Sequence, residues 1–146
     1  GNSIVLEAFL SGTEVTCGVY NSSAGIVALP PTEIVSHTDF FDYEAKYQPG
    51  ATQEICPARI DERLTQRAQA CALTAHQALY CQGYSRTDMI IHQDEIYILE
   101  TNTIPGMTAT SLFPQAAAKA GLDFTRLLDR LIALSLEGSD RSGSAA

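Results

Sequence analysis

An acidic residue and an amide stand where an apolar segment ends, in the stretch YILETN. Tyr97–Leu99 has the composition of a buried strand, and Glu100 and Asn102 follow at alternate positions, so they share one face of that strand. Arg86 and Asp88 stand at alternate positions just before another apolar segment. Carboxylates, an amide and a guanidinium on one face are typical of a site that binds a hard cation and phosphate oxygens.

The two apolar segments, Met89–His92 and Ile96–Leu99, predict a β-hairpin. We take the polar residues Gln93–Glu95 as a three-residue tip. The resulting register gives four pairs on one face: His92 with Ile96, Ile90 with Ile98, Asp88 with Glu100, and Arg86 with Asn102.

This register places two carboxylates opposite one another, which destabilises a sheet. At about 5 Å and an effective dielectric constant of about 20, the repulsion is about 3 kcal/mol. A slipped register would separate the acids but would send Ile90 and Ile98 to different faces. We therefore predict that a divalent cation lies at Asp88 and Glu100, with the Asn102 oxygen as a further ligand, and Mg²⁺ suits these oxygens. The alternative is a solvated, charged end of a hairpin.

Composition limits the class of protein. The chain has 146 residues, 45% of them hydrophobic, and a net charge of −8, which predicts one globular core and no surface for nucleic acid. No apolar run approaches the length of a membrane span. Four cysteines without a C-x-x-C pair indicate reduced thiols in a cytoplasmic protein. The chain opens in Gly1-Asn2-Ser3 without Met, which suggests a piece of something longer.

The elements that must position these residues follow from periodicity. Alternating and apolar segments predict strands, and stripes at helical spacing predict helices, the first of them capped by Asp61 and ended by Gly83. Together they predict an α+β fold, a mostly antiparallel sheet flanked by helices, over residues 1–138 with a frayed tail at 139–146. The expected strands, besides the hairpin, are Ile4–Leu10, Val15–Val19 and Ile26–Leu29, and the expected helices are Asp61–Cys81, Pro114–Ala120 and Asp123–Leu136.

Residues 36–57 show neither period. The aromatic residues Phe40, Phe41, Tyr43 and Tyr47 surround one cation, Lys46. Long connections without regular structure are commonly lids or binding loops, which we predict here. A disordered excursion is the alternative, although its aromatic content argues against it.

Five segments together resemble the carboxy-terminal part of the D-alanine–D-alanine ligases, an ATP-grasp family. They are EAFLSGTEVT, FFDYEAKY, EICPA, GYSRTDMII and IYILETNTIPGMTATSL, and the likeness runs from about residue 5 to 134. The resemblance implies an ATP-grasp subdomain with a long active-site lid. It also implies ATP-dependent joining of two D-alanines through an acylphosphate for peptidoglycan synthesis, with ATP and two Mg²⁺ ions (or Mn²⁺) as cofactors.

The resemblance assigns roles to individual residues. Asp88, Glu100 and Asn102 would bind the two metal ions, which bridge the ATP phosphates. Arg86 and the backbone N–H of Gly106 would form the oxyanion hole, which accounts for glycine after proline because a glycine lets the backbone approach a ligand.

Further roles concern the two substrates. Ser111 and Leu112 would bind the carboxylate of the second D-alanine, although Ser111 also reads as a simple helix N-cap. Lys46 would contact the transferred phosphate. Adenine would lie against the segment formed by Glu7, Ala8, Phe9 and Leu10, and Glu14 would take the ribose hydroxyls. Glu7 and Glu14 also read as exposed strand carboxylates, and Tyr43 and His92 are assigned mainly to packing.

The resemblance also bears on specificity and on what this chain lacks. Relatives that use D-lactate tend to carry Phe where this chain has Tyr47, so we expect D-alanine as second substrate. Phe41 departs from the Tyr that is frequent in the family. The amino-terminal and central domains are absent, so this chain would carry one wall of the site, and the full-length protein is expected to be a homodimer. A non-catalytic module that senses nucleotide or metal is the rival hypothesis.

Overall fold

The computed structural model describes residues 3–36 and 52–142, with side chains up to residue 136. One sheet contains all the described strands, every pair of which is antiparallel. Its order is β4-β3-β1-β5-β6, and β2 pairs with β1 beyond the end of β3. The elements are β1 (Thr13–Ser22), β2 (Gly25–Ala28), β3 (Thr32–Ser36), β4 (Thr52–Ile55), α1 (Glu62–Ala78), β5 (Tyr84–His92), β6 (Glu95–Asn102), α2 (Leu112–Lys119) and α3 (Phe124–Ser142). The predicted α+β fold is confirmed.

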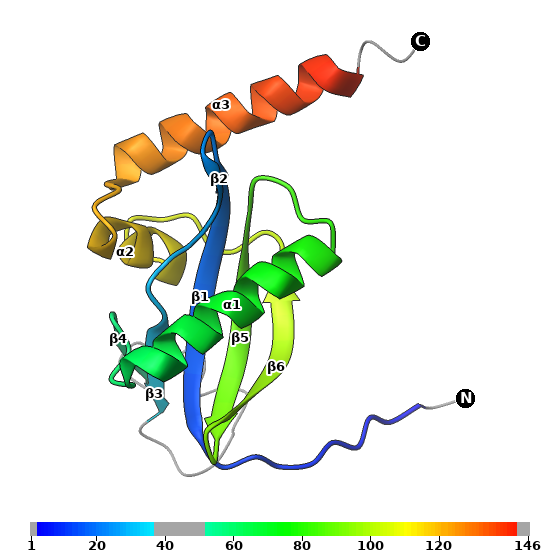
Figure 1. Ribbon diagram of the computed structural model, residues 1–146, viewed down its shortest axis with the longest axis vertical. Coiled ribbons are helices and arrows are strands. Elements are labelled where there is room, and N and C mark those ends of the chain that lie inside the picture. Colours follow the sequence, from blue (N-terminus) through cyan, green and yellow to red (C-terminus); the bar gives the residue numbers. More distant parts are fainter. Residues whose placement is uncertain (1–2, 37–51, 143–146) are drawn as a thin grey trace.

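Helix α1 covers one face of the sheet (Figure 1). The Asp61 carboxylate accepts a hydrogen bond from the backbone N–H of Leu64 at 2.7 Å, which confirms the predicted N-cap. A stripe of small and apolar residues then faces the sheet and forms the first core with strands β1 and β5. This core contains Leu64, Ala68, Ala72, Val15, Cys17, Val19, Met89 and Ile91.

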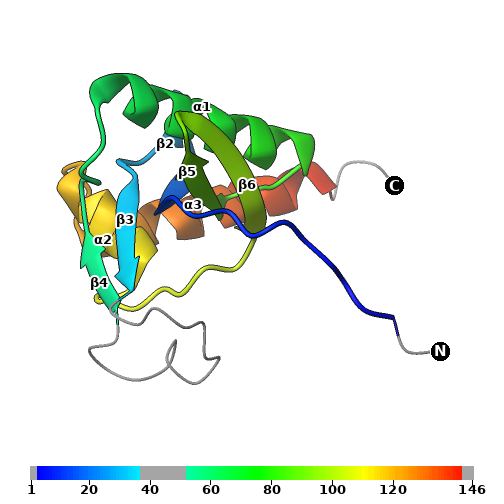
Figure 2. The same cartoon turned by 90° about the horizontal axis from the view of Figure 1, so that it is seen from below.

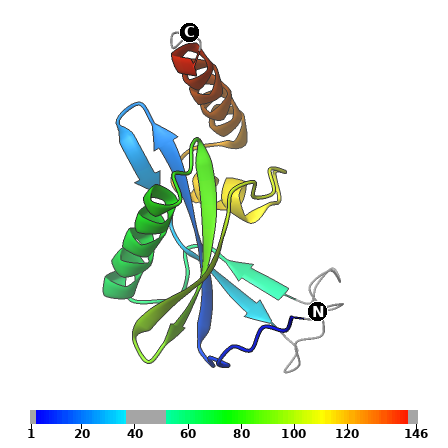
Figure 3. The same cartoon turned by 90° about the vertical axis from the view of Figure 1, so that its right-hand side faces the viewer.

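Helices α2 and α3 lie on the opposite face (Figures 2 and 3). Their core contains Tyr20, Leu29, Phe113, Ala116, Ala117 and Leu127. Gly18 makes this packing possible, because a Cβ there would lie 2.8 Å from the ring of Phe113. The position of α2 on the sheet therefore depends on the missing side chain at Gly18.

All four cysteines are free thiols. Burial raises the pKa of the Cys17 thiol to about 12, and nearby Cys56 and Cys71 add to the effect. Cys17 is therefore protonated and chemically inert, as in a packed core. Within the described ranges, no helix is both long and apolar enough to cross a membrane.

The predicted strand at Ile4–Leu10 is wrong. Residues 3–11 form no regular structure and run away from the sheet (Figure 1). Ile4, Val5 and Leu6 are 84–93% exposed. An apolar strand needs a hydrogen-bonded neighbour, and the described part of the chain supplies none for this segment.

The three helices lie where they were predicted, but their first and last residues differ. Helix α1 ends at Ala78 rather than at Cys81, with Tyr80 at a φ of 53°, so Gly83 does not end it. Helix α2 starts two residues before the expected Pro114, and α3 continues six residues past Leu136. The boundary expected at residue 138 therefore falls inside α3. Strands β3 and β4 were not predicted.

The hairpin prediction was wrong at its tip and right at its base. The turn has two residues, Gln93 and Asp94, with φ of 51° and 65°, as two-residue hairpin turns require. His92 therefore pairs with Glu95, and Ile90 pairs with Tyr97 rather than with Ile98. Leu99 is an extra residue on β6, and this irregularity restores the predicted pairs of Asp88 with Glu100 and Arg86 with Asn102.

Candidate functional site

Two rows of residues cross the sheet on the face that carries α2. In one row Thr16, Asp88 and Glu100 are paired across β1, β5 and β6. Two residues further along the strands, Gly18, Arg86 and Asn102 form the second row. The predicted pair of opposing carboxylates is therefore present, with a guanidinium and an amide in the next row.

Asp88 is held by two neighbours. The Arg86 guanidinium donates from Nε to Oδ1 and from Nη2 to Oδ2, both at 2.9 Å. The Thr16 hydroxyl donates to Oδ1 at 2.5 Å. The Arg86 and Asp88 side chains are only 18% and 19% exposed, so water screens this charge-assisted pair less than a surface ion pair.

Several acids surround Arg86. Its hydrogen bonds to Asp88 raise the pKa of the guanidinium above its usual range, and the charges of Asp88, Glu100 and Glu54 act in the same direction. One guanidinium faces three carboxylates, so the site keeps net negative charge after the ion pair has formed. It therefore still attracts a cation.

Asn102 orders the loop that follows β6. Its Oδ1 accepts a hydrogen bond from the backbone N–H of Ile104 at 3.0 Å, a turn typical of asparagine. Pro105 is buried immediately afterwards. The amide oxygen has a second lone pair, so this turn does not prevent it from binding a metal.

The donor set fits a hard divalent cation. Asp88, Glu100 and Asn102 offer oxygen atoms only, and Glu100 is exposed. In the described part of the chain, no group of three or more His, Cys, Asp or Glu side chains is placed to hold a metal. Mg²⁺ commonly takes one or two carboxylates and completes its shell with waters and phosphate oxygens, which is the shell that these residues could supply in part.

The loop after β6 brings Gly106 and Ser111 together. A Cβ at Gly106 would lie 3.0 Å from the Ser111 hydroxyl oxygen. Ser111 is the N-cap residue of α2, and Leu112 is its first helical residue. Because Phe113 packs on Gly18, the partner of Arg86, the start of α2 lies at the second row of the site.

The predicted nucleotide residues are not gathered at these rows. Glu7, Ala8 and Phe9 are exposed and Leu10 is half-buried, all on the segment that leaves the sheet. Glu14 pairs with Ile90 and therefore lies on the face of Asp88, two residues before Thr16. Lys46 and Tyr47, like Phe40, Phe41 and Tyr43, lie outside the described residues.

Sequence reasoning missed two residues of the site. Thr16 is 4% exposed and bonds Asp88; its signal was a polar residue in the middle of an apolar strand. Glu54 contributes charge at Arg86 and accepts from the side chain of Gln115 at 3.3 Å. Nothing local marked Glu54, because its place depends on the β3–β4 pairing.

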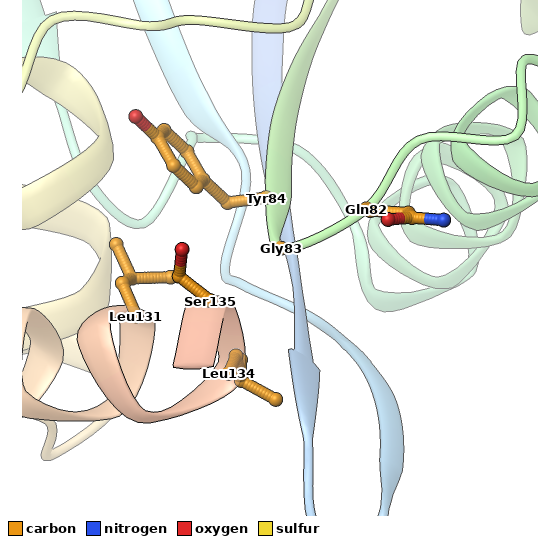
Figure 4. A pocket seen from close by; sticks show the side chains of 6 residues that line it. All are labelled: Gln82, Gly83, Tyr84, Leu131, Leu134 and Ser135. Atoms are coloured by element: carbon orange, nitrogen blue, oxygen red, sulfur yellow. The ribbon is translucent and has the colours of Figure 1, made fainter. Parts of the chain in front are cut away.

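A separate cavity of about 270 Å³ lies between α3 and the start of β5 (Figure 4). Its lining contains no carboxylate and no basic side chain, so it lacks the groups of the candidate site. The lining residues are Gln82, Gly83, Tyr84, Leu131, Leu134 and Ser135.

A family model described as "D-ala D-ala ligase C-terminus" matches residues 1–133. The chain belongs to this family. Among curated relatives, the D-alanine–D-alanine ligase of Syntrophobacter fumaroxidans is 58% identical over 135 residues, which cover 91% of this chain and 43% of the relative. The enzyme of the same name from Desulfotalea psychrophila is 55% identical over 140 residues, covering 94% of this chain and 43% of the relative.

Solved structures of the family have the same fold. The D-alanine–D-alanine ligase of Bacillus anthracis complexed with ATP has a TM-score of 0.75 and 30% identity, covering 92% of this chain and 41% of that one. The VanG D-Ala:D-Ser ligase of Enterococcus faecalis has a TM-score of 0.76 and 38% identity, covering 86% and 37%. This chain spans about two fifths of the length of the relatives that it matches.

Proposed function

We propose that this chain is the carboxy-terminal part of a ligase that uses ATP to join two D-alanines through an acylphosphate, for peptidoglycan precursor synthesis in the cytoplasm. The observation that carries the proposal is the pair Asp88 and Glu100 on neighbouring strands, with Arg86 bonded to Asp88. Family membership supplies the reaction class.

The metal residues would act on the nucleotide. Asp88, Glu100 and Asn102 would hold Mg²⁺, two ions by the resemblance, with Mn²⁺ as an alternative. A bound ion of this kind neutralises phosphate charge during phosphoryl transfer. Thr16 and Arg86 orient the Asp88 carboxylate on the face of the sheet that also carries Glu100.

Arg86 and the start of α2 would act on the amino acids. The guanidinium has five N–H groups, and two of them bind Asp88. The others, with the backbone N–H of Gly106, would stabilise the oxyanion of the tetrahedral intermediate. Ser111 and the backbone N–H of Leu112 would bind the carboxylate of the second D-alanine, since the N-terminus of a helix favours an anion.

The remaining contacts would be shared between this chain and the domains outside it. The segment Glu7–Leu10 and Glu14 would bind adenosine together with the central domain. Lys46 and Tyr47 would cover the transferred phosphate and the second substrate. The amino-terminal domain would complete the site for the first D-alanine, and the full-length protein would act as a homodimer.

The test is turnover by the full-length protein. We expect ATP hydrolysis that depends on D-alanine and Mg²⁺ and yields D-alanyl-D-alanine. Because a D-Ala:D-Ser ligase is among the structural relatives, D-serine and D-lactate should be assayed as second substrates in parallel. A protein that binds ATP and Mg²⁺ but turns over none of these substrates would instead be the non-catalytic sensor.

A further inference from the structure

Ser111 is an N-cap residue that does not cap its helix. Its φ of −74° and ψ of 151° are those of an N-cap, yet its side chain makes no capping hydrogen bond. Serine at this position ordinarily accepts from the second or third backbone N–H of the helix, which stabilises it by about 1 kcal/mol. The third residue here is Pro114, which has no N–H. Helix α2 therefore begins without the usual contribution.

The Ser111 hydroxyl turns back to Thr108 instead. Its oxygen accepts from the Thr108 backbone N–H at 3.0 Å and lies 2.8 Å from the Thr108 hydroxyl oxygen. The Ser111 backbone N–H donates to the Thr108 carbonyl oxygen at 2.9 Å. The two residues are thus joined by two side-chain contacts and one backbone hydrogen bond.

The hydrogens of this cluster can be accounted for. A hydroxyl has one hydrogen and two lone pairs. The backbone N–H of Thr108 takes one lone pair of Ser111, and the Thr108 hydroxyl takes the other when it donates. Thr108 is free to donate because its own oxygen can accept from the Thr110 hydroxyl at 3.3 Å. The hydrogen of Ser111 then remains for a ligand.

We propose that Thr108 is a positioning residue for Ser111. It holds the Ser111 hydroxyl away from the first turn of α2 and leaves that hydroxyl as a hydrogen-bond donor to the carboxylate of an amino-acid substrate. The same arrangement leaves the backbone N–H groups of Leu112 and Phe113 without the N-cap side chain as acceptor, so they can face the same anion. This inference rests on the proposed function and adds a residue to it.

The test is made in the full-length protein, with the KM for the second D-alanine, the KM for ATP, kcat and Tm as readouts. Thr108→Val removes the hydroxyl and keeps the branched shape. We expect it to raise the KM for the second D-alanine about tenfold, the effect of one hydrogen bond to a charged group, with the KM for ATP unchanged. Thr108→Ser, which keeps the hydroxyl, should restore that KM to within about twofold.

A double-mutant cycle separates positioning from simple packing. If Thr108 acts through Ser111, Thr108→Val should add nothing in a Ser111→Ala background. Thr103→Val, an exposed threonine in the same loop, is the matched control and should leave all four readouts unchanged. Thr108→Ala replaces the valine variant if Tm shows that the valine variant is unfolded.

Two results would overturn this inference and leave the proposed function unaffected. One is an active protein in which Thr108→Val or Thr108→Ala leaves the KM for the second D-alanine within twofold of wild type. The other is an equal rise in KM with and without the Ser111 hydroxyl, which would make Thr108 a structural residue only. A wild-type protein that forms no dipeptide would overturn the proposed function and this inference with it.

Discussion

At the scale of single residues, Arg86 holds Asp88 and would also stabilise the oxyanion of the tetrahedral intermediate. Its bidentate contact with Asp88 offsets part of the repulsion between Asp88 and Glu100. From the sequence we expected a bound cation to offset that repulsion, and in the structure Arg86 already does so in part. Because Glu100 and Glu54 also act on Arg86, the site remains acidic and still favours a metal ion.

His76 gives a prediction about pH. The ring lies on the buried face of α1 and is fully buried, with Nδ1 2.7 Å from the Ser85 hydroxyl and Nε2 3.0 Å from Asn21 Oδ1. Burial lowers the pKa of His76 from its ordinary value of 6.5. The unfolded chain therefore takes up the proton first, so the stabilisation is complete above pH 6.5 and is lost as the pH falls below it.

Urea unfolding of the chain at pH 8 and pH 5.5 measures this effect. His76→Gln should lower the free energy of unfolding by about 1–3 kcal/mol at pH 8, because it leaves buried polar partners unsatisfied. Between pH 8 and pH 5.5, the free energy of unfolding of this variant should then fall by less than that of the wild type. An unchanged pH dependence in His76→Gln would refute the assignment.

At the scale of elements, Gly18 allows the first turn of α2 to pack closely on the sheet. A methyl group at Gly18 would contact both the Phe113 ring and Leu29 at under 3.0 Å. We expect Gly18→Ala to destabilise the chain by about 1–3 kcal/mol through overpacking. It should also weaken substrate binding in the full-length protein, because Ser111 moves with α2. Urea unfolding and the KM for the second D-alanine measure the two effects.

A smaller partner side chain should relieve the clash. Phe113→Leu alone leaves a cavity and is also destabilising. Combined with Gly18→Ala, it should cost less than the sum of the two single changes. Strictly additive losses would show that Gly18 does not position α2 through Phe113.

The hairpin shows how far the sequence could predict the site. The pairs at Asp88 and Arg86 were predicted correctly, but only because two departures from the predicted register cancel. The tip was taken one residue too long, and the extra residue Leu99 compensated for that error. The position of a bulge depends on the twist and packing of the sheet, so the amino-acid composition of β6 did not predict it.

Other elements depend on partners distant in sequence. Strand β4 has four residues, three of them exposed, and exists through its pairing with β3; such a strand has no period of its own to detect. The segment Ile4–Leu10 has the opposite property, a clear strand pattern without a partner in the described chain. Helices were easier to place because their hydrogen bonds are local.

At the scale of the whole molecule, several large apolar residues are exposed near the amino-terminus and after β6. Ile4, Val5, Leu6 and Phe9 are 79–93% exposed, and Ile104 is 80% exposed beyond the edge strand β6. Exposed apolar surface of this kind marks a contact with other protein. The relatives are more than twice as long as this chain. We therefore propose that domains of the full-length protein outside this chain cover these apolar residues.

Hydrogen exchange tests this proposal. The backbone amides of residues 4–10 should exchange rapidly in the isolated chain and slowly in the full-length protein, because pairing into a sheet protects them. The isolated chain should also form no D-alanyl-D-alanine. The amides of Val15–Val19, in the centre of the sheet, are the control and should be protected in both. Rapid exchange at 4–10 in the full-length protein would contradict the proposal.

Formation of D-alanyl-D-alanine by the full-length protein, as a function of Mg²⁺ concentration, tests the central claim that Glu100 and Asp88 hold the metal that binds the nucleotide. Glu95→Gln is the matched control, because it lies on the same strand and loses only an exposed ion pair with Arg67. We expect Glu100→Gln to nearly abolish turnover at every Mg²⁺ concentration, while Glu95→Gln follows the wild-type curve. A Glu100→Gln variant with wild-type turnover and an unchanged Mg²⁺ curve would contradict the account.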